Sequence, residues 1–313
     1  MLALTVCCTG RHALAATVDF NDPEQDYVAE NISIASNDST AAINAKNVIL
    51  SGTAPSQYGV YLNTETTGGG TIAGVKNILS IHAADTIGVT TLQGAALHVE
   101  GSYRFDGDAE NIMEGVSLVL NARNISLTGG WASGGHYTDN IAVYSAKKAA
   151  VLITDGNAGG GTLTVRAAEQ HNDTSLFPGH NTSLYAWQGG TIAVAFGNHS
   201  RLDFSGGLVA YGDNTQVDIS TGTGSSAVID GNLVAIEGQV RIDTTSSNRI
   251  TAPLIMTQSG RLISASARKR RHKADSPVSL AVWFPLMATT VMAAVLSICI
   301  FRAKTMFSQA LPK

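Results

Sequence analysis

Four acidic side chains in the segment FDGDAENIMEG, residues 105–115, could in principle bind a cation or exchange protons. They are Asp106, Asp108, Glu110 and Glu114. A calcium site needs several converging oxygen ligands, and glycoside hydrolysis needs two carboxylates that flank one sugar bond. Four acids within a single short Gly-containing segment are more typical of a solvated loop. The sequence therefore predicts neither a metal site nor a catalytic acid pair here.

Other motifs with catalytic chemistry are absent from the sequence. There is no Gly-x-Ser-x-Gly nucleophile motif, no His-x-x-x-His pair and no repeated calcium-binding nonapeptide. Asp203, Asp213 and Asp218 do not share a spacing that would align them on one face. Neither an acid pair nor a basic groove for an acidic polymer is evident. We therefore predict no catalytic residue, no metal and no cofactor, and a protein that is not an enzyme.

Aromatic residues are scarce, at 6% of the chain, and several of them gather in its middle beside Gly-rich segments. Exposed rings can stack on sugars or anchor a protein partner, because they combine a large apolar face with a polar edge. Packing at an interior corner is the alternative, and the sequence does not decide between the two. The candidate partner-contact residues are Trp131, Tyr137, Tyr185 and Trp187.

The bulk composition excludes several classes of protein. Only 14% of the 313 residues are charged, and the net charge is −4, so no clustered basic face for nucleic acid is expected. The three cysteines are Cys7, Cys8 and Cys299, which leaves the body of the chain without a disulfide framework or thiolate metal site. The many small residues and scattered aliphatic ones suit a long, thin core.

Short apolar segments with a period of two recur between residues 17 and 265, as in TLTV, QVDIS and QVRID. This is the periodicity of β-strands, not of helices. Gly, Asn and Asp clusters separate the segments, for example DGN at 155–157 and again at 230–232. These residues adopt turn conformations at low cost. The nearest candidate for a helix, 142–151, is short.

One short strand, opened by Asn, is written four times: ENISIAS at 30–36, AKNVILSG at 45–52, VKNILSI at 75–81 and ARNISLTGG at 122–130. A coil of a solenoid cannot bury its apolar face alone, and neighbouring coils do so by stacking. The repeats therefore predict an all-β parallel β-helix over 17–265, with ten or eleven coils of 20–25 residues and side-chain amides hydrogen-bonded between coils. A β-sandwich is the alternative.

The two ends of the chain are predicted to be targeting segments. Residues 1–16 contain a short apolar run and the small-residue site Ala13-Leu14-Ala15, typical of a secretory signal. Residues 278–301 are uncharged and long enough to cross a membrane as a helix. The basic linker 266–277 before this span favours a cytoplasmic body, whereas the signal favours export. We favour export to the cell envelope or surface, with a short tail at 302–313.

The strand-rich body, together with phrases such as GGTIAV, NTSLYAWQGG and TLTVRAAE, resembles the passenger region of bacterial autotransporters and related repeat adhesins. The resemblance implies a right-handed parallel β-helix on a cell surface that acts in adhesion or contact with a host or cell-surface protein or glycan. Autotransporters end in a translocator β-barrel, and here a single transmembrane helix takes its place after 265. A carbohydrate-active β-helix enzyme and a truncated, non-functional fragment are the alternatives.

Overall fold

The computed structural model describes most of the body of the chain. The described residues are 18–35, 39–52, 58–63, 77–101, 103–106, 109–112, 115–130, 141–167, 181–244, 247–252 and 255–266, and all of them lie in one compact unit. The predicted leader, 1–16, and the predicted membrane helix, 278–301, lie outside these residues. Within the described ranges no helix is long and apolar enough to cross a membrane.

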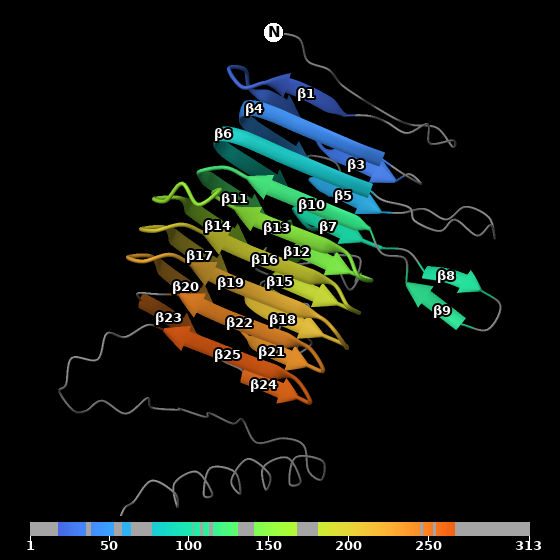
Figure 1. Ribbon diagram of the computed structural model, residues 1–313, viewed down its shortest axis with the longest axis vertical. Helices are drawn as coiled ribbons and strands as arrows, with labels where there is room; N and C mark the ends of the chain where they lie inside the picture. Colours follow the sequence, from blue (N-terminus) through green and yellow to red (C-terminus); the bar gives the residue numbers. More distant parts are fainter. Residues whose placement is uncertain are drawn as a thin grey trace, which may run out of the picture. The chain divides into compact units, whose positions relative to one another are not determined.

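The regular elements of the described residues are all β-strands (Figure 1). They are β1 (Asp19–Asp22), β2 (Tyr27–Ala29), β3 (Ile32–Ala35), β4 (Ser39–Gly52), β5 (Val60–Asn63), β6 (Asn77–Thr91), β7 (Leu97–Glu100), β8 (Tyr103–Asp106), β9 (Ala109–Ile112), β10 (Val116–Asn121), β11 (Asn124–Thr128), β12 (Ile141–Ala146), β13 (Ala150–Thr154), β14 (Thr162–Arg166), β15 (Thr182–Trp187), β16 (Thr191–Phe196), β17 (Arg201–Ser205), β18 (Gly207–Tyr211), β19 (Gln216–Thr221), β20 (Ser226–Asp230), β21 (Leu233–Ile236), β22 (Gln239–Thr244), β23 (Ser247–Thr251), β24 (Ile255–Gln258) and β25 (Arg261–Ser266).

The strands stack into a parallel β-solenoid with three walls. Face 1 contains β1, the first halves of β4 and β6, and then β10, β13, β16, β19, β22 and β25. Face 2 contains β2, the second halves of β4 and β6, and then β11, β14, β17, β20 and β23. Face 3 is a separate eight-stranded sheet of β3, β5, β7, β12, β15, β18, β21 and β24. Only the β8–β9 hairpin is antiparallel among the paired strands.

The corner between faces 1 and 2 is visible as a break in the alternation of buried and exposed residues along β4. Its inward residues include Ile43 and Ala45, after which two residues in a row, Lys46 and Asn47, point away from the core before Val48 is buried again. Successive side chains of a strand alternate between its two sides, so an extra outward residue turns the wall. The pairing of β4 with β6 shifts register at the same place. A single long strand therefore serves two walls.

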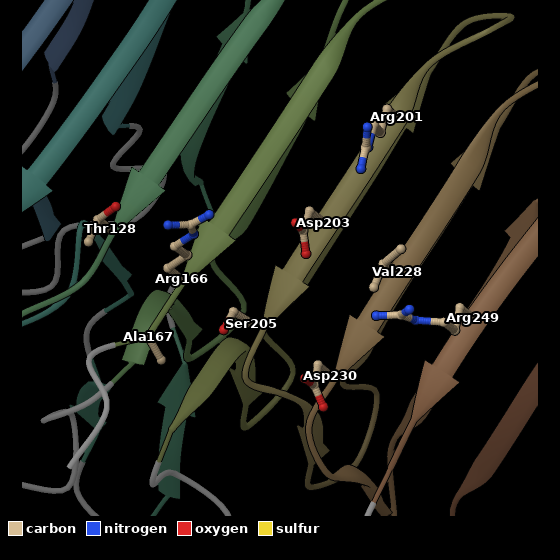
Figure 2. Close-up of a pocket in the computed structure, with 9 residues that line it drawn as sticks. All are labelled: Thr128, Arg166, Ala167, Arg201, Asp203, Ser205, Val228, Asp230 and Arg249. Atoms are coloured by element: carbon tan, nitrogen blue, oxygen red, sulfur yellow. The ribbon is translucent and has the colours of Figure 1, made fainter. Parts of the chain in front are cut away.

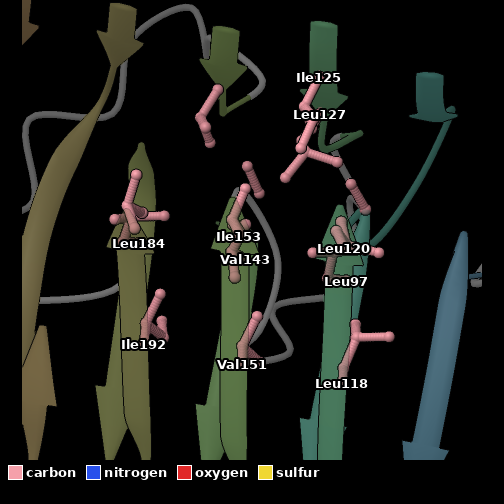
Figure 3. Packing of buried hydrophobic residues seen from close by; sticks show 14 of the residues in the cluster. Leu97, Leu118, Leu120, Ile125, Leu127, Val143, Val151, Ile153, Leu184 and Ile192 are labelled. Carbon is pink, nitrogen blue, oxygen red and sulfur yellow. The ribbon is translucent and has the colours of Figure 1, made fainter. Parts of the chain in front are cut away.

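Aliphatic side chains from all three walls fill the interior (Figure 3). Leu118 and Leu120 of β10, Ile125 and Leu127 of β11 and Val143 of β12 are each no more than 2% exposed. Residues at equivalent positions of successive coils pack on one another, as the register of β10 with β13 requires. Full burial of such side chains stabilises the fold by roughly 1.5–3 kcal/mol each. The thin aliphatic core that the composition predicts is confirmed.

The strand predictions are confirmed where the alternation is clear. TLTV belongs to β14, QVDIS to β19 and QVRID to β22. The DGN segment at 155–157 contains a turn between faces 1 and 2, whereas the one at 230–232 starts with the last residue of β20 and bends toward face 3. The candidate helix 142–151 is instead β12, a turn and the start of β13, with positive φ at Lys147 and Lys148. Face 3 was hardest to predict, because strands such as β12 and β15 are buried on both sides and lose the alternating pattern.

The coils are fewer and more unequal than the predicted ten or eleven. Eight strands form face 3 in the described part of the chain, which corresponds to eight complete coils before β25. Paired strands are only 22 residues apart at Gln239 and Arg261, but 41 apart at Ala150 and Thr191. Long connections between walls lengthen the middle coils, and a uniform repeat of 20–25 residues therefore does not hold.

Two of the repeated Asn residues form side-chain hydrogen bonds between coils at the corner of faces 1 and 2. Asn47 Nδ2 donates to Asp26 Oδ1 at 2.7 Å. Asn124 Nδ2 donates to Asp85 Oδ1 at 3.2 Å, and its Oδ1 accepts a hydrogen bond from Thr162 Oγ1 at 2.8 Å. At these two copies the Asn that opens the repeated strand therefore lies at a polar corner, and the apolar residues after it belong to a wall. The copies fall on different faces: those at 45–52 and 122–130 lie mainly on face 2, whereas the one at 75–81 lies on face 1.

Candidate functional site

The outward side of face 3 carries a row of rings in register across successive coils. Tyr61, His98, Tyr144 and Tyr185 pair from strand to strand. The ring centroids of His98 and Tyr144 are 4.7 Å apart, and those of Tyr144 and Tyr185 are 5.8 Å apart and nearly parallel. Aromatic pairs at such separations stabilise beyond the area that they bury. The row continues into a second apolar cluster that includes Val209 of β18 and Val234 of β21. The outward side of these strands is therefore largely buried.

A buried ionic group lies next to the ring row. His98 Nε2 is 3.0 Å from Glu100 Oε2, and Lys147 Nζ contacts Glu100 Oε1. Burial raises the pKa of Glu100, but hydrogen bonds and charge from His98 and Lys147 lower it by more, so the net pKa lies below its ordinary value. Lys147 reaches this carboxylate because it adopts a positive φ at the corner after β12. The group ties the corner of one coil to the wall of the previous one.

We predict that Glu100→Gln destabilises the protein in a pH-dependent way. A carboxylate whose pKa is lowered by folding contributes stability above its unfolded pKa and loses it as the pH falls through the folded value. The variant should therefore lose roughly 1–3 kcal/mol at pH 7, and the difference should shrink as the pH falls below the ordinary glutamate value of about 4.3. Urea unfolding at several pH values measures it, with the exposed Glu30→Gln as the control. A difference independent of pH would contradict this role.

The predicted contact aromatics divide between described and undescribed residues. Trp131 and Tyr137 lie outside the described residues. Tyr185 is 9% exposed within the ring row, and Trp187 is half-buried against the same second cluster. The structure therefore brings Tyr185 and Trp187 together on face 3, where they pack in the wall. A contact role for the four residues stays a prediction.

The acidic residues weighed from the sequence are not gathered into a site by the described structure. Asp106 and Glu110 are on the β8–β9 hairpin, while Asp108 and Glu114 lie outside the described residues. Asp203 is on face 2, whereas Asp218 is on face 1. No group of three or more potential metal ligands occurs among the described residues.

The outward side of face 2 carries a hollow of about 570 Å³ (Figure 2). The hollow extends over β11, β14, β17, β20 and β23. Its charged residues come from four of these strands: Arg166 ends β14, Arg201 and Asp203 are on β17, Asp230 ends β20 and Arg249 is on β23. All three arginines and Asp230 are exposed, and Asp203 is half-buried. Three cations and two anions thus share one wall.

Strand register explains how residues so distant in sequence meet. Arg166 pairs with Ser205, and Ser205 pairs with Asp230. Asp203 pairs with Val228, and Val228 pairs with Arg249. Successive side chains of a strand point to opposite sides. Because the strand neighbours Val165, Phe204 and Ile229 point into the core, the charged side chains beside them point outward. Adjacent strands lie about 4.8 Å apart, so Arg166 and Arg249 are held roughly 14 Å apart across the stack.

The arginines of the hollow are not neutralised by acidic side chains of the described residues. Among the described residues, the side chains of Arg166, Arg201 and Arg249 form no ion pair. Face 1 provides the contrast, because Arg241 Nη2 lies 2.9 Å from Asp243 Oδ2, two residues along the same strand. Arg201 and Asp203 have the same spacing on β17 and are not paired. The guanidinium groups of the hollow are therefore available to a ligand.

Sequence reasoning missed this group of residues. The relevant segments, TVRAA, RLDFS, AVIDG and NRIT, are each ordinary alternating strands with one or two charges. The local sequence offers only a partial signal: a Gly follows β11, β17 and β20, at Gly129, Gly206 and Gly231, where face 2 turns into face 3, whereas an Ala follows β14 and β23. A side chain at Gly231 would overlap the backbone of Gly206, since the added Cβ would lie 2.2 Å from its carbonyl carbon. These glycines mark equivalent corners.

The fold and the hollow define a parallel β-solenoid with a charged wall. Comparisons with protein-family models, with curated proteins and with solved structures give no match.

Proposed function

We propose that this protein is a membrane-tethered β-solenoid of the cell envelope or surface that binds a partner, without catalysis, through face 2. The observation that carries the proposal is the difference between the walls. Face 3 is packed on both sides around a ring row, whereas face 2 presents arginines that form no ion pair within the described chain. A solenoid wall offers many weak contacts along its length, a binding mode typical of repeat proteins.

The surface location in this proposal rests on sequence features. Residues 278–301 have the length and apolar composition of a membrane span, and 1–16 have an export-like small-residue site. The resemblance to autotransporter passengers and repeat adhesins supports display on a surface. We include its right-handed winding in the proposal, because connections between parallel strands of one sheet are almost always right-handed.

Two measurements test the tether and its orientation. The full-length chain should stay in carbonate-washed membranes, and deletion of 278–301 should release it. Protease added to intact cells should cleave the solenoid, whereas cleavage only after lysis would place it in the cytoplasm and overturn surface display. Each experiment reports on location alone and not on the choice of ligand.

The contact wall is tested by charge reversal. We expect the triple variant Arg166→Glu, Arg201→Glu and Arg249→Glu to abolish attachment of cells that display the full-length chain to partner cells or coated surfaces. The control is the double variant Arg241→Glu and Arg261→Glu, which reverses two exposed charges on face 1 and is compared with the triple variant and with the double variant Arg201→Glu and Arg249→Glu. Equal loss of attachment in the two double variants would contradict a specific role for face 2.

A carbohydrate-active enzyme is the second candidate, and one observation favours it. Asp203 and Asp230 lie on adjacent strands of face 2, diagonal to each other in the register. Two carboxylates across a hollow are the minimum that glycoside hydrolysis needs. Release of unsaturated or reducing ends from polygalacturonate, lost in Asp203→Asn, would favour the enzyme. Binding of the polymer without release would favour the contact protein.

A further inference from the structure

We infer that the hollow on face 2 is a binding site for an acidic polysaccharide, a linear chain in which anionic groups alternate with free hydroxyl groups. This inference rests on the proposed contact function and names the chemical class of the ligand. It is carried by the arrangement of Arg166, Arg201 and Arg249 around Asp203 and Asp230 (Figure 2).

The arginines specify an anion. A guanidinium is a planar, permanently charged donor whose geometry matches a carboxylate or sulfate through two parallel hydrogen bonds. Three such groups are spread over the stack from β14 to β23 rather than focused on one point. Arg166 and Arg249 are separated by two intervening strands. An extended ligand with repeated anionic groups can engage them together.

The two aspartates exclude a ligand that is anionic throughout. Asp203 lies between Arg201 and Ser205 on its own strand, and Asp230 is in register with Ser205. A dense series of phosphates or carboxylates laid across the wall would meet these carboxylates and be repelled. A sugar hydroxyl, in contrast, donates a hydrogen bond to a carboxylate. An acidic polysaccharide supplies both kinds of group in every repeat, whereas poly-glutamate has no hydroxyl group and the phosphates of a nucleic acid form a continuous anionic series.

The wall itself is preorganised for an elongated ligand. The charged residues of β14, β17 and β20 are on strands whose alternate residues, such as Leu202, Phe204 and Ile229, are fully buried, and on β23 Ile250 is partly buried against the same core. The backbone positions are therefore fixed by the core, and only side-chain rotamers have to be ordered on binding. Sites built on strands of a rigid scaffold lose less entropy than loop sites.

The test measures binding of polygalacturonate to the full-length chain in detergent by isothermal titration calorimetry. We expect binding that weakens with added salt, no binding of neutral dextran, and weak or no binding of poly-glutamate. Arg201→Ala and Arg249→Ala should each lower the affinity about tenfold. The control Arg241→Ala, an exposed arginine on face 1, should leave it unchanged.

Asp203→Asn separates the ligand classes. If Asp203 accepts a hydrogen bond from a sugar hydroxyl, the neutral amide binds the polysaccharide more weakly, because charge-assisted hydrogen bonds are the stronger ones. If the ligand is a uniform polyanion such as an acidic protein segment, removal of the negative charge strengthens binding instead. Stronger binding by Asp203→Asn, or poly-glutamate binding as tight as that of polygalacturonate, would overturn the inference.

The two proposals can fail separately. If polygalacturonate does not bind while the triple charge reversal still abolishes cell attachment, face 2 remains the contact wall and the ligand is not an acidic polysaccharide. If polygalacturonate binds and the reversal leaves attachment intact, the glycan site stands and the proposed contact function is wrong.

Discussion

Phe204→Ala should lower the free energy of unfolding by about 3–5 kcal/mol, the largest effect that we expect from a single substitution. Phe204 is 0% exposed on β17 and is one of the two largest fully buried side chains, together with Tyr144. It pairs with Val165 on one side and Ile229 on the other. A thin core of small aliphatic residues has no spare side chain to fill the space that a removed ring leaves.

The reason for the size of this effect lies in the architecture. Each coil of a solenoid contacts only its neighbours, so a cavity in one coil weakens two interfaces at once. Urea unfolding of the full-length chain, followed by far-ultraviolet circular dichroism, measures the change. Phe20→Ala is the matched control, because Phe20 is only half-buried in the first coil. A loss in Phe20→Ala as large as that in Phe204→Ala would contradict the argument.

Asp155→Ala should cost about 3 kcal/mol, the second largest effect. Asp155 is 4% exposed at the corner after β13. Its carboxylate accepts hydrogen bonds from the backbone N–H groups of Asn157 at 2.9 Å and of Gly197 at 2.9 Å, and from Ser200 Oγ at 3.3 Å. The Asn157 bond shapes the turn of its own coil, and the others tie that coil to the next. Removal of the carboxylate leaves buried donors without an acceptor.

The chain supplies its own control for Asp155. The tripeptide Asp-Gly-Asn occurs at 155–157 and again at 230–232. Asp230 is exposed, and its side chain forms no hydrogen bond with the described residues. Asp230→Ala should therefore change the free energy of unfolding by less than about 0.5 kcal/mol. If thermal or urea unfolding showed equal losses in the two variants, the buried contacts of Asp155 would not be the cause.

The same tripeptide shows where sequence reasoning stops. The change of chain direction at each position, a turn after β13 and a bend after β20, follows from local chemistry, because Asp, Gly and Asn all favour such conformations. Whether the carboxylate is buried depends on which residues of the next coil lie beside it. Gly197 lies 42 residues from Asp155, and no local sequence pattern predicts their contact. The proposed contact surface likewise depends on distant residues, since Arg166, Arg201 and Arg249 align only through strand register.

By itself, the sequence determined that the body would be built of short stacked strands with turns at Gly, Asn and Asp. These features depend on backbone preferences and on a side-chain period of two, which are local properties. The tertiary structure alone decided which wall each strand joins, that the middle strands of face 3 are buried on both sides, and that three arginines share face 2. The physical reason is that coils differ in length: paired residues are 21 positions apart at Ser226 and Ser247 but 46 apart at Leu97 and Val143. Separation along the chain therefore does not predict which side chains become neighbours.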